Sequence, residues 1–177
     1  MNRASILRTV VVLLLVSLVE RSLALPDGAP EGTCDDMMPF HVGSKHLNGS
    51  DSPYMLVQEK ETFEPNESIS VQLHVKSSYF RGFLVKAFSE QGEDVGHFLE
   101  GPNYKPMETC SGATHESNND KKNVKFVWKA PVDKSGSVRF KATVVHDYSL
   151  FYTDLWSTVK RRHHLSDQSP GLLNKHQ

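Results

Sequence analysis

Apolar and polar residues alternate along several stretches of this chain, and the alternation predicts β-strands. In "SISVQLHVKS" (68–77) an apolar side chain falls on every second position, and "NVKFVWKAP" (123–131) and "SVRFKATVV" (137–145) repeat the pattern. Successive side chains of a strand point to opposite faces of the sheet. One face of each of these strands is therefore predicted to be buried and the other to be wet.

Less regular runs extend the pattern. "YMLVQEKETF" (54–63) predicts a strand before the turn "EPNES", "FRGFLVKAFSE" (80–90) carries apolar residues on both faces, and "VGHFLEG" (95–101) predicts a short strand. Residues 25–53 are punctuated by proline and glycine and are expected to form a loop. Seven or eight short strands separated by turns predict an all-β fold, an Ig-like antiparallel β-sandwich, with a small β-barrel as the alternative.

Residues 1–24 are predicted to be a secretory signal peptide. Two arginines precede the apolar run 10–19, and Ser22-Leu23-Ala24 provides a small-x-small cleavage pattern. The run is too short for a transmembrane helix, which needs roughly 20 residues, although an uncleaved anchor is the alternative. We therefore expect a secreted, extracellular domain at 25–158, no later membrane span, and a flexible polar tail at 159–177. The basic run in that tail is either solvated or a docking patch.

Charge and cysteine content narrow the function. The whole chain has a net charge of −1, and loss of residues 1–24, with three arginines and one glutamate, makes it −3. This charge argues against nucleic-acid binding. Cys34 and Cys110 are the only cysteines, and in an oxidising compartment we expect a disulfide between them, a reactive thiol being the alternative. Asn48 and Asn66 stand in Asn-x-Ser sequons and are expected to carry N-glycans.

The pair His146-Asp147 follows the alternating stretch 137–145 and is the main candidate for catalysis. If the strand continues, the two side chains point to opposite faces, and if it ends there, "DYS" favours a turn. No G-x-S-x-G, H-E-x-x-H, C-x-x-C or glycine-rich phosphate loop is present. The histidines are spread over separate segments, so a metal site would need tertiary convergence. We expect a non-enzymatic protein without cofactor or metal.

Five segments carry a family resemblance. They are "LPDGAPEGTCDDMMPFH" (25–41), "SPYMLV" (52–57), "FRGFLVKAF" (80–88), "CSGATHESNNDKKNVKFVWKAP" (110–131) and "GSVRFKATVV" (136–145). Their order resembles a reeler domain, the module named after the N-terminal region of reelin. The resemblance covers roughly residues 25–156 and is strongest to small secreted members of the defence-protein or noduler-like type. It implies an Ig-like sandwich in which Cys34 is bridged to Cys110. Larger relatives add haem-carrying membrane helices and reduce ferric chelates, an activity not expected of this sequence.

The resemblance also implies a function. Such members bind microbial surface components, lipopolysaccharide or similar, or the haemocyte surface, and promote antibacterial humoral or nodulation responses. The alternative is an extracellular-matrix or adhesion module that binds protein partners.

The resemblance supplies no ligand contacts, so aromatic residues beside basic ones are the candidates. Stacking on such rings, with a basic residue meeting a lipid phosphate, is the hypothesis. Core or edge-strand packing is the alternative role for the same rings. The candidates are Tyr79, Phe80, Arg81, Tyr148, Phe151 and Tyr152, with Trp156 near them.

Overall fold

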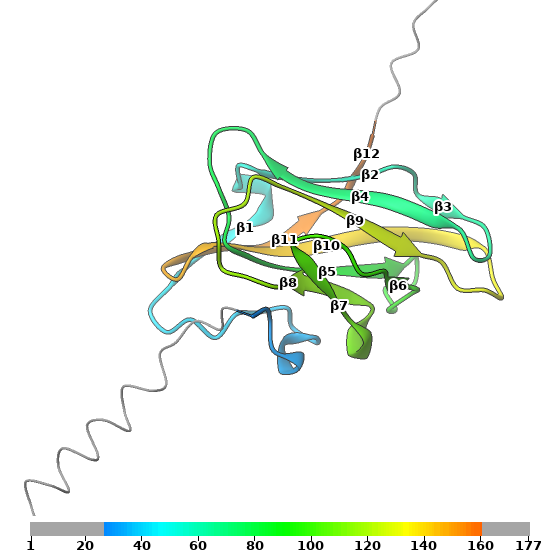
Figure 1. Ribbon diagram of the computed structural model, residues 1–177, viewed down its shortest axis with the longest axis horizontal. Coiled ribbons are helices and arrows are strands. Elements are labelled where there is room, and N and C mark those ends of the chain that lie inside the picture. Colours follow the sequence, from blue (N-terminus) through cyan, green and yellow to red (C-terminus); the bar gives the residue numbers. More distant parts are fainter. Residues whose placement is uncertain (1–26, 161–177) are drawn as a thin grey trace, which may run out of the picture.

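The computed structural model describes residues 27–160, which form two β-sheets packed face to face (Figure 1). The predicted signal peptide and the tail beyond residue 160 lie outside these residues. Within the described range, no helix has the length and apolar character needed to cross a membrane. The short 3₁₀ helices there are η2 (Glu31–Thr33), η3 (Gly49–Asp51) and η4 (Glu108–Cys110).

The larger sheet has the strand order β1-β11-β10-β5-β8-β7, and β3 pairs with the beginning of β10. Its long central strands, β5 and β10, run antiparallel and are paired over eight residue positions each. The strands are β1 (Lys45–Asn48), β3 (Thr62–Phe63), β5 (Gly82–Ser89), β7 (Tyr104–Met107), β8 (Gly112–His115), β10 (Gly136–Asp147) and β11 (Leu150–Trp156).

The smaller sheet has the order β12-β2-β4-β9-β6. The chain passes from β11 in the larger sheet to β12 in the smaller one through Ser157 alone. The strands are β2 (Tyr54–Gln58), β4 (Ser68–Val75), β6 (His97–Phe98), β9 (Asn123–Lys129) and β12 (Thr158–Val159).

The core lies between the two sheets, where alternation along the strands predicted it. In β4, Ile69, Val71 and Leu73 are fully buried, whereas Ser68 and Ser70 on the other face are exposed. Trp128 is fully buried and donates its indole N–H to the carbonyl of Val95 at 3.0 Å. A side chain of that size inside the sandwich buries its ring and satisfies its one polar atom.

The structure confirms the all-β sandwich and corrects its details. The described residues contain twelve strands, more than the seven or eight expected. Two edge pairings, β1 with β11 and β12 with β2, are parallel, so the sandwich is not wholly antiparallel. β1 lies inside the expected loop 25–53, and β12 continues beyond the expected boundary at 158, where the Lys160 amide donates to the Gln58 carbonyl at 2.8 Å. These short edge strands depend on long-range pairing rather than on local alternation.

Candidate functional site

The N-terminal segment 28–41, here called the strap, crosses the outer face of the larger sheet (Figure 1, blue). The Cys34–Cys110 disulfide ties it to η4, with a Cα–Cα distance of 5.7 Å. Cys34, Met37 and Leu84 are buried together with Met107 and Cys110 in a second, smaller core. The strap therefore covers a sheet face that would otherwise be open to water.

A buried lysine on the sheet holds the middle of the strap. Lys86 of β5 is 5% exposed, and its Nζ donates to the carbonyl of Cys34 at 2.8 Å. The same Nζ lies 3.0 Å from a carboxylate oxygen of Asp94. A buried ammonium group needs such partners, since an unpaired charge in the interior is costly.

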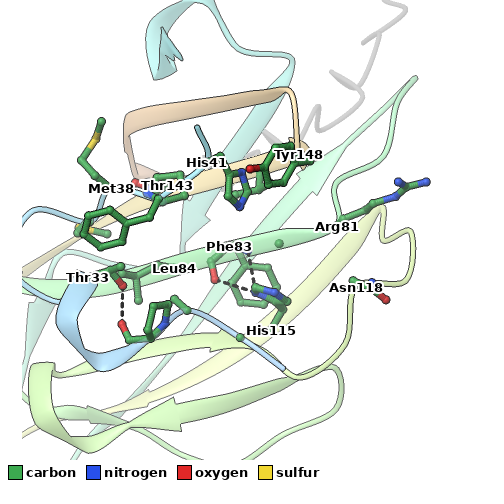
Figure 2. A pocket seen from close by; sticks show the side chains of 18 of the residues that line it. Thr33, Met38, His41, Arg81, Phe83, Leu84, His115, Asn118, Thr143 and Tyr148 are labelled. Atoms are coloured by element: carbon green, nitrogen blue, oxygen red, sulfur yellow. Dashed lines mark hydrogen bonds between the residues drawn. The ribbon is translucent and has the colours of Figure 1, made fainter. Parts of the chain in front are cut away.

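Between the strap and the sheet lies a pocket of about 470 Å³. Its floor is formed by Phe83 and Leu84 of β5 and by Thr143 of β10, all of them buried. Its other wall is the strap, including Met38 (Figure 2). Pockets that hold small molecules fall in this range of volume and are lined mainly by apolar groups.

The two ends of the pocket differ in polarity. Ala29, Pro30, Met37 and Leu84 line the end near the second core. At the opposite end Arg81 and Asn118 extend away from the apolar residues (Figure 2). The pocket is therefore amphipathic along its length.

Two stacked rings stand between these ends. His41 of the strap lies over Tyr148, with ring centroids 4.6 Å apart (Figure 2). Burial lowers the pKa of His41, although a hydrogen bond between its ring and the backbone of Tyr148 acts in the opposite direction, so the neutral imidazole predominates at pH 7. Within residues 27–160, its Nδ1 is a buried nitrogen without a hydrogen-bond partner. Such an atom is unusual, because buried polar groups are normally satisfied.

The charged groups at the polar end nearly cancel. Nε of Arg81 lies 2.8 Å from a carboxylate oxygen of Asp120. This hydrogen bond is the main reason that the pKa of Arg81 is raised. Hydrogen bonds from Ser149 lower the pKa of Asp147, which also lines the pocket and stays ionised at neutral pH. The one arginine of the pocket is thus accompanied by two carboxylates.

The loop that supplies Asn118 is held by a second buried lysine. Nζ of Lys121 donates to the carbonyls of Arg81 at 2.9 Å, Ser117 at 2.5 Å and Asn119 at 2.8 Å. Burial lowers the pKa of Lys121. These bonds fix the 117–121 loop against the residue that precedes β5.

His115 closes the floor at the end of β8. It is 8% exposed, and its Nδ1 lies 3.2 Å from the amide nitrogen of Phe83. A Cβ atom at Gly82 would come within 3.0 Å of the imidazole ring. Glycine at position 82 therefore leaves room for this histidine beside the pocket.

The structure separates the predicted ligand-contact residues into two groups. Arg81 and Tyr148 line the pocket. Tyr79 lies beside them, with its ring 5.4 Å from the Arg81 guanidinium carbon. Phe80, Phe151 and Tyr152 are 0%, 4% and 8% exposed. These three rings are buried in the interior, which favours the core-packing alternative for them. Trp156 lies elsewhere, against Phe88 and Arg139.

The His146-Asp147 pair stands at the end of a strand. β10 ends at Asp147, and Asp147 accepts hydrogen bonds from the amide and hydroxyl of Ser149 in the hairpin turn to β11. A register shift at this point brings His146 Nε2 to 3.9 Å from Asp147 Oδ2, closer than a regular strand allows. His146 Nδ1 instead lies 2.9 Å from the hydroxyl of buried Tyr54, which gives the histidine a structural partner.

The remaining predicted positions have clear places in the fold. Asn48 and Asn66 are both exposed; the side chain of Asn48 accepts a hydrogen bond from the Ser50 amide at 2.9 Å, and Asn66 has a φ of 60°. Within residues 27–160, no three histidine, cysteine or acidic side chains are grouped as metal ligands. Glycan occupancy stays a prediction.

The sequence reasoning missed the strap as a wall of a pocket. Met38, His41, Asn118 and Thr143 come from separate parts of the chain and share no motif. The available signal was the apolar residues in the loop segment "MMPFH", next to a cysteine expected to be bridged.

Fold and sequence place this domain in a known class. Residues 32–166 match the model of the reeler domain, and the chain belongs to the reeler-domain family.

Relatives are found among insect proteins. The chain is 33% identical over 150 residues to "Putative defense protein 1" of Antheraea mylitta, covering 78% of this chain and 87% of that protein. It is 31% identical over 166 residues to "Putative defense protein" of Bombyx mori, covering 87% and 94%. A "Putative ferric-chelate reductase 1 homolog" of Drosophila melanogaster is 32% identical, but the match covers only 22% of that protein.

Solved structures support the fold. The Reelin-N domain of F-spondin superimposes with a TM-score of 0.54 at 23% identity, covering 69% of this chain and 94% of that one. At this identity the likeness concerns the fold alone.

Proposed function

We propose that this protein is a secreted defence protein that binds an amphipathic component of microbial surfaces in the pocket beneath the strap. Two relatives named as putative defense proteins, 30% and 33% identical over 78% of this chain, support the defence role. The sequence of residues 1–24 supports secretion. Promotion of antibacterial humoral or nodulation responses would follow from such binding.

One observation carries the choice of site. The pocket has an apolar end, formed in part by Met37 and Leu84, and a polar end at Arg81 and Asn118. Molecules of microbial envelopes that combine an apolar chain with a polar head match this division. In the apolar part of the pocket a chain is partly removed from water, which favours binding in proportion to the buried area.

Filling the pocket tests the proposal. Met38→Trp places a larger side chain in a half-exposed strap position that lines the pocket. We expect this variant to bind Gram-negative and Gram-positive cells at least about tenfold more weakly than the wild type, a loss of roughly 1.4 kcal/mol. The measurement is sedimentation of purified, oxidised protein with cells, repeated with soluble lipopolysaccharide as competitor.

Met55→Trp is the matched control. Met55 is also half-exposed but lies on β2 in the other sheet, away from the pocket. Equal cell binding by both variants would show that the pocket is not the site. Absence of cell binding by the folded wild-type protein, with retention on insoluble tissue matrix, would support an adhesion module instead.

A further inference from the structure

We propose that the pocket selects an amphiphile with a single apolar chain and an uncharged, hydroxyl-bearing head group, with the head held among Arg81, Asn118 and Asp147. The inference rests on the proposed function, because it concerns the ligand of the same pocket. It differs from the expectation that a basic residue meets a lipid phosphate.

The charges at the polar end disfavour a charged head group. Arg81, the one arginine of the lining, is already paired with Asp120 at 2.8 Å. Asp147 adds a second carboxylate, and Lys121, bonded to the Arg81 carbonyl, adds a second cation, so the polar end carries charges of both signs. A phosphate or carboxylate head would face Asp147 at close range, and a cationic head would face Arg81; either repulsion is strengthened where water is partly excluded.

The hydrogen-bonding groups suit hydroxyls. The guanidinium has five N–H donors, of which the contact with Asp120 uses the one on Nε. The Asn118 amide both donates and accepts, and Asp147 Oδ2 accepts, since Oδ1 is the atom bonded by Ser149. A hydroxyl group donates one proton and accepts at its lone pairs, so several hydroxyls can meet donors and acceptors in turn.

The unsatisfied nitrogen of His41 supplies an independent observation. Its Nδ1 is buried and lacks a partner among the described residues, and the ring belongs to the pocket lining. A neutral imidazole nitrogen can donate to or accept from a hydroxyl. The Nδ1 atom is covered in the structure, so a ligand hydroxyl would reach it only after the His41 ring turns toward the pocket.

The apolar part of the pocket admits a chain rather than a second sheet or helix. The whole pocket has a volume of about 470 Å³, in the range of small-molecule pockets. The floor is formed by Phe83, Leu84 and Thr143, and the strap lies over it, so a chain between the two would be partly shielded from water.

Three amphiphiles with straight alkyl chains of seven or eight carbons and different heads test the inference. Octyl glucoside, octanoate and octyltrimethylammonium, each kept below its micelle concentration, are titrated by calorimetry into the full mature protein. We expect octyl glucoside to bind at least about tenfold more tightly than either charged compound. In Asp147→Asn the affinity for octanoate should rise by about threefold or more, because the repelling carboxylate is gone while the Oδ1 acceptor for Ser149 is kept.

The outcomes separate the two proposals. The inference would be overturned if the wild type bound octanoate or octyltrimethylammonium more tightly than octyl glucoside. It would also be overturned if the wild type bound none of the three compounds. An Asp147→Asn variant whose affinity for octanoate does not change would overturn the assigned place of the head. A different outcome would overturn the proposed function instead. In it, the wild type binds octyl glucoside and Met38→Trp does not, yet Met38→Trp binds cells as well as the wild type. Circular dichroism of each variant checks the fold.

Discussion

At the scale of single residues, Tyr54 shows how a polar group is placed inside the sandwich. It is 2% exposed, and its hydroxyl lies 2.8 Å from the Tyr79 carbonyl and 2.9 Å from His146 Nδ1. Burial raises the pKa of Tyr54 to about 12, with nearby Tyr152 adding to the effect. The hydroxyl thus joins β2 to the end of β10, where the candidate pair His146-Asp147 lies.

Tyr54→Phe should lower the free energy of unfolding by about 1–2 kcal/mol at pH 7. Because the folded state holds the phenol proton more tightly than the unfolded chain, this contribution is complete below pH 10 and is lost as the pH rises toward about 12. Urea unfolding of both proteins across this pH range measures the difference. A gap between them that stays constant up to pH 12 would contradict the assigned pKa.

At the scale of elements, the strap depends on its covalent link to η4. Strap residues that line the pocket, such as Met38 and Pro39, belong to no strand of either sheet. The link spans a sequence separation of 76 residues. A cross-link of that span restricts the unfolded chain strongly and also keeps the strap on the sheet.

Replacing Cys34 and Cys110 together by serine should lower the free energy of unfolding by about 2–5 kcal/mol. The strap should also loosen, so that binding of octyl glucoside is lost while the far-ultraviolet spectrum of the sandwich is kept. Urea denaturation and calorimetric titration of the double variant test both effects. Wild-type affinity in the folded double variant would mean that noncovalent contacts, such as Lys86 with the Cys34 carbonyl, hold the strap unaided.

At the scale of the whole molecule, a buried glutamine connects the two sheets. Gln58 of β2 is 1% exposed, and its Nε2 donates to the Val138 carbonyl of β10 at 2.9 Å. Its Oε1 accepts from the hydroxyl of Ser157, where the chain crosses between the sheets. The Ser157 hydroxyl in turn accepts from the Phe140 amide at 2.9 Å. This network predicts that the two sheets unfold as one unit.

Gln58→Met should therefore destabilise the domain by about 2–3 kcal/mol, because several buried partners lose their hydrogen bonds at once. Gln72→Met is the control, since Gln72 pairs with Asn123 on the outer face of the smaller sheet and should change stability by no more than about 0.5 kcal/mol. Circular dichroism and tryptophan fluorescence should report coincident transitions for both variants. Separate transitions would show that the sheets are not one cooperative unit.

Much of the fold was predictable because the alternation of apolar and polar residues within a single strand shows which of its faces is buried. The alternation along 68–77, 123–131 and 137–145 predicted long strands with one buried face, and the structure confirms them. The disulfide between Cys34 and Cys110 followed from the compartment and is present. The turn after His146-Asp147 was one of two interpretations of the same few residues.

The site was predictable only in part. Arg81 and Tyr148 were expected at a ligand and do line the pocket, but Phe80, Phe151 and Tyr152 are interior. Alternation cannot assign a face where β10 and β11 shift register, and it cannot show that both faces are covered at Phe151–Thr153 of β11. Only the fold shows which aromatic rings remain near the surface.

The sequence by itself determined the long strands and the cross-link, because periodicity, turn residues and cysteine count depend on near neighbours and on the compartment. The tertiary structure alone decided where the strap lies, which ends of the pocket are apolar and polar, and that Arg81 is neutralised by Asp120. Those features join residues from distant parts of the chain. These residues come together only when the sheets pack and the disulfide holds the strap on the larger sheet. No local sequence pattern therefore predicts their contacts.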